Sequence, residues 1–347
     1  MMSRSPWSDE TDEQFATFLS GMMPQTLQSL ETISDVKLGA ISFLALSNHS
    51  TSLTSLKLQL VQDTIPHLAL LQGCTALRTL QLNDSSKRID LEALDDEVFR
   101  QISTWLSDCK KLNCLVFTDF GLKASTLATP FLLRNHDQLE ELQIDFYPAD
   151  DPNAQDVNTR EFLLALTHQS LSLTALSLRG ESPQLRDDLD AVVESLIQLR
   201  KLRQLQIREV SETFRDEHMD LLAENLTELE ELVISGSGPS DATLFSFCTL
   251  QELRSLTLSG ISRCTASGIL SFVENLGPDN AGLILTIDMA DSDYALAVEE
   301  QEKIRRALEA KVGGRFEYTL VRGKLLNVGS QYGTCLLIHF RSRGLFI

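Results

Sequence analysis

The hexapeptide Leu53-Thr54-Ser55-Leu56-Lys57-Leu58 decides the fold, because its pattern L-x-x-L-x-L returns throughout the chain. With Ile or Phe allowed at the last position, the pattern begins again at Leu77, Leu112, Leu139, Leu173, Leu202, Leu229 and Leu253. Successive copies start 24 to 35 residues apart, and a period of this size indicates stacked structural repeats. Weaker copies at 27–30, 283–287 and 316–320 extend the array at both ends.

Each repeat is expected to combine a short strand with a helix. The L-x-L alternation puts every second side chain on one face of a strand. In the spacers, apolar residues recur at steps of three and four, which predicts helices within 89–106, 186–199 and 218–226. Asp241 is a candidate N-cap for a helix over 242–248. Stacked copies bury apolar faces that one copy cannot bury alone. The sequence therefore predicts an α/β solenoid of ten or eleven repeats, a horseshoe with parallel concave strands and convex helices.

Composition excludes several classes of protein. The 347 residues include 62 leucines and are 43% hydrophobic, which is too high for a disordered chain. A net charge of −19 argues against binding to nucleic acid or to an anionic membrane. No apolar segment approaches the ~20 residues of a membrane span, and no secretory signal is visible. We expect a cytoplasmic or nuclear protein whose six cysteines are reduced, small buried residues.

Three segments are expected along the chain. Residues 1–11 form a flexible N-terminus, 12–322 the repeat domain, and 323–347 a C-terminal cap or a disordered tail. The acidic loop 145–156 has a partial calcium-loop spacing, but Asp156 stands where the turn glycine belongs and Phe162 where the bidentate Glu belongs. A solvated insertion between repeats is the preferred interpretation.

The motif and its helical spacers resemble those of leucine-rich repeat proteins, close to the ribonuclease-inhibitor-like and cysteine-containing subtypes, over residues 12–320. The Asn or Cys that this family carries three residues after the last motif position is missing here, for example at Val61 and Phe120. Cys74 and Cys109 share one phase, three residues before a first leucine, as in the repeats of F-box proteins. The chain is most similar to fungal F-box/leucine-rich-repeat proteins.

An F-box is not recognisable in this chain. We interpret residues 8–23 as a first repeat helix or cap, because Phe15, Phe18 and Leu19 precede Leu27 as each spacer helix precedes its strand. A divergent F-box is the alternative, although its three helices would need about 40 residues before the first strand.

No pattern of a catalytic, metal or cofactor site is present. The six histidines are scattered, without a zinc-protease motif, a nucleophile elbow or a clustered zinc pair of Cys and His. Gly236 to Asp241 lies between a strand and a helix, but it has no lysine and reads as a turn rather than a phosphate loop. We therefore expect a protein that is not an enzyme.

Binding is expected on the concave face, where residues flanking the last motif leucine point outward. Acidic residues in the middle of the array precede two arginines on the next two repeats. Such a mixed polar surface suits protein recognition. The residues that we expect to contact a partner are Asp84, Asp119, Glu141, Gln143, Asp145, Phe146, Arg179, Gln206 and Arg208.

Three functions are compatible with this architecture. The resemblance implies substrate recognition for an SCF-type ubiquitin ligase, with ubiquitin-ligase adaptor subunits as further partners. The second is a free-standing scaffold or inhibitor that covers its target. The third, an enzyme, would require His, Asp and Ser side chains that converge in a deep pocket.

Overall fold

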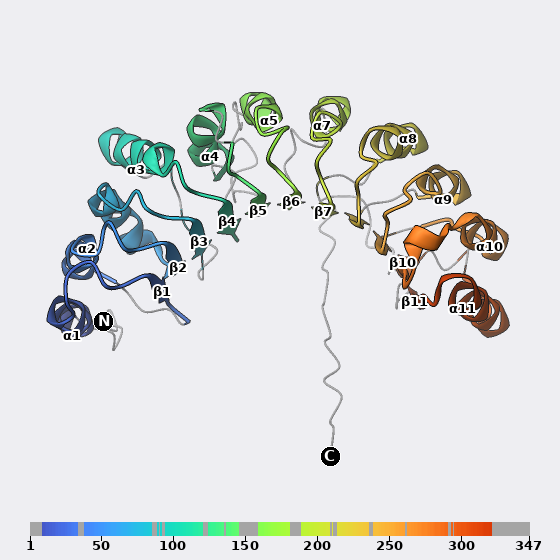
Figure 1. Cartoon of the computed structure of the whole chain (residues 1–347), viewed down its shortest axis with the longest axis horizontal. Coiled ribbons are helices and arrows are strands. Elements are labelled where there is room, and N and C mark those ends of the chain that lie inside the picture. The colour runs from blue at the N-terminus through green and yellow to red at the C-terminus, as the bar shows by residue number, and fades with distance from the viewer. Residues whose placement is uncertain are drawn as a thin grey trace, which may run out of the picture.

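The computed structural model describes residues 9–33, 38–84, 89, 91, 94–120, 124–134, 137–145, 159–180, 189–208, 210, 214–235, 239–260, 262–290, 293 and 295–320. Within these ranges, eleven strands form one parallel sheet whose order follows the sequence from β1 to β11. The sheet lines the inside of an arc, and the helices cover its outside (Figure 1). The predicted solenoid of strand-helix repeats is therefore confirmed.

The strands are short and regular. Their bounds are β1 Ser29–Glu31, β2 Ser55–Leu60, β3 Thr79–Asp84, β4 Cys114–Thr118, β5 Glu141–Asp145, β6 Ala175–Arg179, β7 Gln204–Arg208, β8 Glu231–Ser235, β9 Ser255–Ser259, β10 Ile284–Ala290 and β11 Arg315–Leu320. The three weak copies of the motif form β1, β10 and β11, so they are true repeats.

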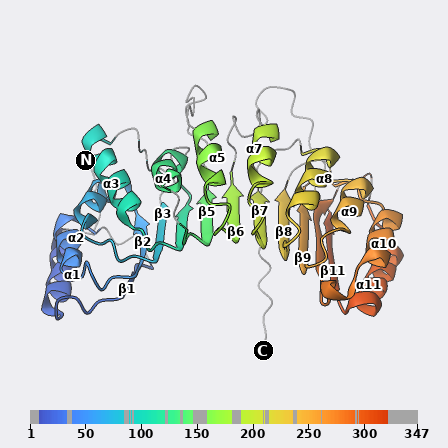
Figure 2. The same ribbon diagram turned by 45° about the horizontal axis from the view of Figure 1, so that its top comes forward.

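A helical segment follows most strands on the convex side. The bounds are α1 Asp9–Gly21, α2 Ala40–Ser47, α3 Asp96–Asp108, α4 Ala124–Leu133, α5 Thr159–Thr167, α7 Leu189–Leu196, α8 Asp216–Asn225, α9 Asp241–Phe247, α10 Ala266–Asn275 and α11 Val298–Val312, with 3-10 segments η1 Gln62–Leu71 and η2 Pro278–Asn280. These helices run side by side along the outer side of the arc (Figure 2). The expected first repeat helix over 8–23 corresponds to α1.

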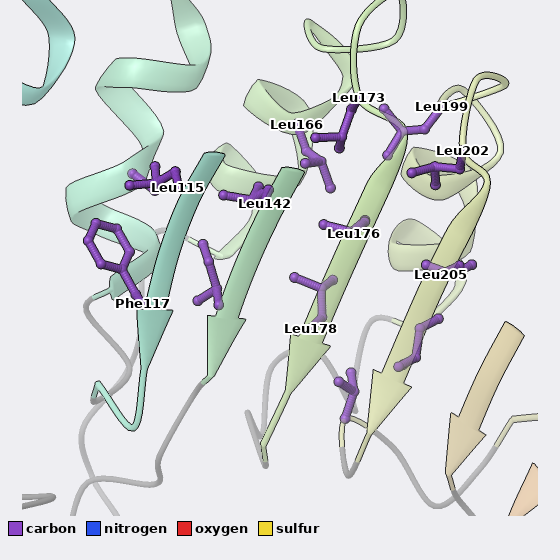
Figure 3. Close-up of a cluster of buried hydrophobic side chains, with 14 of the residues drawn as sticks. Leu115, Phe117, Leu142, Leu166, Leu173, Leu176, Leu178, Leu199, Leu202 and Leu205 are labelled. Atoms are coloured by element: carbon purple, nitrogen blue, oxygen red, sulfur yellow. The ribbon is translucent and has the colours of Figure 1, made fainter. Parts of the chain in front are cut away.

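The middle leucine of each motif forms a continuous row in the core. Leu142, Leu176 and Leu205 are direct partners in the register of β5, β6 and β7, and each is at most 1% exposed. Their side chains point from the sheet toward the helices (Figure 3). Burial of one leucine stabilises the fold by about 1.5–3 kcal/mol. The repeated leucine therefore holds neighbouring repeats in register.

Polar side chains join the turns of consecutive repeats. Gln169 donates from Nε2 to the Leu132 carbonyl at 2.7 Å, and His49 Nδ1 accepts from the Leu27 amide at 3.3 Å. Both residues are buried and lie four residues before the first leucine of their motif, at Leu173 and Leu53. They satisfy backbone groups that the turns would otherwise leave unpaired in the interior.

Two predicted helix starts need correction. Asp95 Oδ1 accepts from the Glu97 amide at 2.9 Å, so α3 begins at Asp96 rather than near residue 89. Ser240 is the N-cap of α9, because its Oγ accepts from the Ala242 amide at 3.1 Å. Asp241 is the first helical residue instead, and its carboxylate accepts from the Thr265 amide of the next repeat at 2.7 Å.

Candidate protein-binding surface

The centre of the concave face presents a row of polar side chains from three adjacent strands. Gln143 lies opposite Ser177, and Ser177 lies opposite Gln206, in the register of β5, β6 and β7. All three are partly exposed, because the leucine before each and the leucine or isoleucine after it take the core-facing positions. These strands occupy the middle of the arc (Figure 1). The side chains are thus placed where a molecule held inside the horseshoe would touch them.

The ends of the same strands carry opposite charges. Glu141 begins β5 and is exposed, whereas Arg179 and Arg208 end β6 and β7, are exposed, and are direct partners in the sheet register. Like charges at opposing positions of a sheet are unfavourable. A further side chain restrains the row, since Gln206 Nε2 donates to Glu231 Oε1 at 2.9 Å. The face therefore offers an acidic side and a basic side separated by amides and a hydroxyl.

Asp145 does not form part of this exposed surface. It is only 3% exposed, and burial raises the pKa of its carboxyl, although a donor on Gln143 at 3.3 Å and the charge of Arg179 act in the opposite direction. A hydrogen bond with the backbone of Asp119 also lowers the pKa. The expectation that Asp145 faces outward is therefore wrong, because the residue is buried and its carboxylate is bound by Gln143 of its own strand and by the Asp119 backbone of the preceding repeat.

Asp84 is also buried, with 1% of its surface exposed. It lies opposite Leu60 in the register of β2 and β3, which is the core-facing phase of a period-two strand. Its Oδ2 accepts from the Ile89 amide at 2.6 Å. The prediction of an exposed Asp84 is wrong for this reason. Asp119 is partly exposed and has a left-handed φ of 59°, and Phe146 lies outside the described residues.

The sequence interpretation missed the polar residues that link the repeats. Asp216 on α8 accepts from Ser240 Oγ at 3.0 Å, and Asp241 on α9 accepts from Thr265 Oγ1 at 2.6 Å, so the start of one helix holds the cap of the next. These contacts could have been predicted from an Asp at the start of one helix and a Ser or Thr just before the next helix. These contacts stabilise the solenoid and leave the concave face free for other contacts.

Catalytic chemistry finds little support among the described side chains. Within the described ranges, no group of three or more His, Cys, Asp and Glu residues could hold a metal ion. Burial raises the pKa of the Cys109 and Cys264 thiols to about 12, which disfavours the nucleophilic thiolate. A pocket on the convex side, near Trp105 of α3, is lined by Gln, Glu, Arg, Thr, Trp and Asp side chains.

Among the helices that the structure describes, none is both long and apolar enough to cross a bilayer.

Comparison with known proteins identifies the fold rather than a close relative. No protein-family model matches the chain, and no curated protein matches it. Rad7, in the crystal structure of the Rad7 and Elc1 complex in yeast, superposes with a TM-score of 0.50 at 15% identity, over 88% of this chain and 74% of Rad7's. The leucine-rich repeat-containing protein LegL7 from Legionella pneumophila gives 0.46 at 13% identity, over 88% of this chain and 96% of its own.

The chain is a leucine-rich repeat solenoid. Its in-register motif leucines, sequential parallel sheet and convex helices together define this fold. Leucine-rich repeat solenoids present extended concave surfaces for binding. The polar row on β5 to β7 lies on that surface.

Proposed function

We propose that this leucine-rich repeat solenoid is a non-catalytic protein-interaction module that binds a protein partner on the concave face of β5 to β7. One observation carries the proposal. Glu141, Gln143, Arg179, Gln206 and Arg208 gather there, exposed or partly exposed, on three adjacent strands. Complementary charge sets the orientation of a protein partner and suppresses wrong partners.

The finer proposal is substrate recognition linked to an SCF-type ubiquitin ligase. Its support is the resemblance of the repeats to F-box/leucine-rich-repeat proteins, together with the similarity in fold to Rad7, which was solved in complex with Elc1. By this analogy a ubiquitin-ligase adaptor subunit is a further partner. The alternative is a free-standing leucine-rich repeat scaffold or inhibitor that is unrelated to ubiquitination.

Site-specific photocrosslinking tests the concave surface. A photoreactive amino acid at Ser177, on the concave strand β6, should crosslink a partner in cells. The matched control is Glu194, which is exposed on the convex helix α7 that follows β6. Partner crosslinks from Glu194 that equal those from Ser177 would reject the concave site.

The identity of the crosslinked protein then separates the two functions. Co-purification of the partner with adaptor and cullin subunits supports the ligase role. A stoichiometric partner without these subunits supports the scaffold. In either case, Glu141→Lys combined with Arg208→Glu should abolish the Ser177 crosslink, whereas Glu194→Lys should leave it unchanged.

A further inference from the structure

The two ends of the solenoid differ in how they close the core. In the register of β1 and β2, Leu30 lies opposite Leu56, which is fully buried. Leu30 itself is only partly buried, as are Leu27, Phe15 and Met22 around it. These side chains have the core neighbours of one repeat but lack those of a preceding one among the described residues. The first described repeat therefore exposes part of the leucine core at its outer side.

Phe18 enlarges this apolar surface. It is 65% exposed on α1, and its ring stacks on Phe15 with centroids 6.4 Å apart. Terminal repeats of soluble solenoids normally carry a polar outer face. We call Phe15, Phe18, Met22, Leu27 and Leu30 the N-terminal end surface. An apolar surface of this kind marks a binding site when a partner can cover it.

The C-terminal end is closed by a polar helix. Ile304 and Leu308 of α11 are fully buried, and Phe316 of β11 is 3% exposed. On the other side of α11, Glu302 accepts from Arg306 at 2.9 Å and from Arg305 at 3.2 Å. The last described repeat thus carries ion-paired side chains on the outer side of its helix, whereas the first carries the exposed Phe18 ring.

Charge indicates what kind of molecule can cover the N-terminal end surface. Residues 11–33 include acidic side chains at 12, 13 and 31 and contain no Lys or Arg. Of these, Asp12 accepts a hydrogen bond from the Gly39 amide, and Glu31 Oε2 lies 4.0 Å from Lys57 Nζ. Two copies joined end to end by this surface would bring acidic groups together. A partner with basic groups beside an apolar face would be complementary.

We propose that the N-terminal end surface docks an amphipathic helix of a protein partner, with an apolar face on Phe15, Phe18 and Leu30 and flanking Lys or Arg residues. An apolar helix face bound in this way would replace the contacts that a preceding repeat supplies elsewhere in the solenoid. This interface is separate from the concave face and does not depend on the function proposed there.

The experiment uses the full chain and two synthetic helical peptides. Both carry the same leucine stripe; one has flanking lysines and the other has flanking glutamates. Isothermal titration should detect the lysine peptide and not the glutamate peptide. Phe18→Ser should weaken binding about tenfold, because the ring loses its apolar contact. The matched control is Phe245→Ser on α9, which removes an equally prominent ring at 69% exposure and should leave binding unchanged.

Hydrogen exchange gives a second measurement that does not rely on a variant. Bound lysine peptide should slow amide exchange in α1 and β1 and leave the strands β5 to β7 unaffected. Equal weakening by Phe18→Ser and Phe245→Ser would overturn the proposal, as would protection only on the concave strands. A concentration-dependent dimer in sedimentation that Phe18→Ser dissolves would show that a second copy covers the surface, and would also overturn it.

Discussion

The Nδ2 atom of Asn280 lies 3.0 Å from the carbonyl oxygen of Leu250, so one side chain spans the boundary between two repeats. The same atom donates to the carbonyls of Gln251 at 2.9 Å and Leu253 at 3.0 Å. Asn280 is only 3% exposed. Its buried amide therefore satisfies backbone oxygens of the preceding turn.

Replacement of this amide should destabilise the C-terminal repeats. Asn280→Ala removes the buried donor to the Gln251 and Leu253 carbonyls, which costs about 1–3 kcal/mol, whereas the Leu250 carbonyl keeps the Leu253 amide as a donor at 3.3 Å. Urea unfolding followed by circular dichroism measures the loss. Asn275→Ala is the control, because Asn275 is exposed on α10 and its side chain donates to the Ser271 carbonyl of its own helix. An equal loss in both variants would contradict the role of Asn280.

Two neighbouring residues of β7 should respond very differently to truncation. Leu205 is fully buried, whereas Gln206 is partly exposed on the concave face. Leu205→Ala should lower the free energy of unfolding by about 2–5 kcal/mol. Gln206→Ala should change it by less than about 0.5 kcal/mol, as surface changes usually do. Equal effects in equilibrium denaturation would show that the register of β7 is wrong.

The buried thiols should be unreactive in the folded protein. Burial raises the pKa of Cys109 and Cys264 to about 12 and that of Cys74 to about 11, so almost no thiolate exists at neutral pH. Cys248 is less buried, although its pKa is also raised. Timed alkylation with peptide mass spectrometry should label Cys248 before these three. Unfolding in urea should abolish the difference, and labelling of Cys109 as fast as Cys248 in the native state would refute it.

Asp145 should make stability depend on pH in an unusual direction. Its pKa is raised by burial, so the unfolded chain releases this proton at lower pH than the folded protein does. The carboxyl therefore favours the folded state while it is protonated, and that contribution is lost as pH rises through the folded pKa. Asp145→Asn should remove this loss. The unfolding midpoints of both proteins are measured from acidic to neutral pH. A gain in stability of the wild type relative to the Asp145→Asn variant as pH rises would contradict the prediction.

The sequence predicted the fold because one residue type repeats in one register. Leu142, Leu176 and Leu205 follow the same motif, and their strands pair directly. Alternation along a strand also located Gln143, Ser177 and Gln206 on the face opposite the leucines. These inferences need only the period of the chain.

The parts that failed depend on contacts rather than on period. Asp84 and Asp145 were expected on the exposed surface, but hydrogen bonds to Ile89 and Gln143 hold their carboxylates in buried positions. Likewise, the exposure of Phe18 arises because no described repeat precedes it. Local sequence patterns do not predict which polar side chains form hydrogen bonds with the next repeat.

The strictly sequential order of the sheet determines how the molecule comes apart. Each interior strand pairs with the strands before and after it in the chain, so no strand pairing in the described sheet joins the two tips of the horseshoe. The stability of such an array is close to a sum over neighbouring repeats. Thermal unfolding should therefore start at β1, a three-residue strand beside a partly exposed part of the core, and proceed toward the middle of the array. A ligand bound at this end would therefore also stabilise the repeats that follow against unfolding.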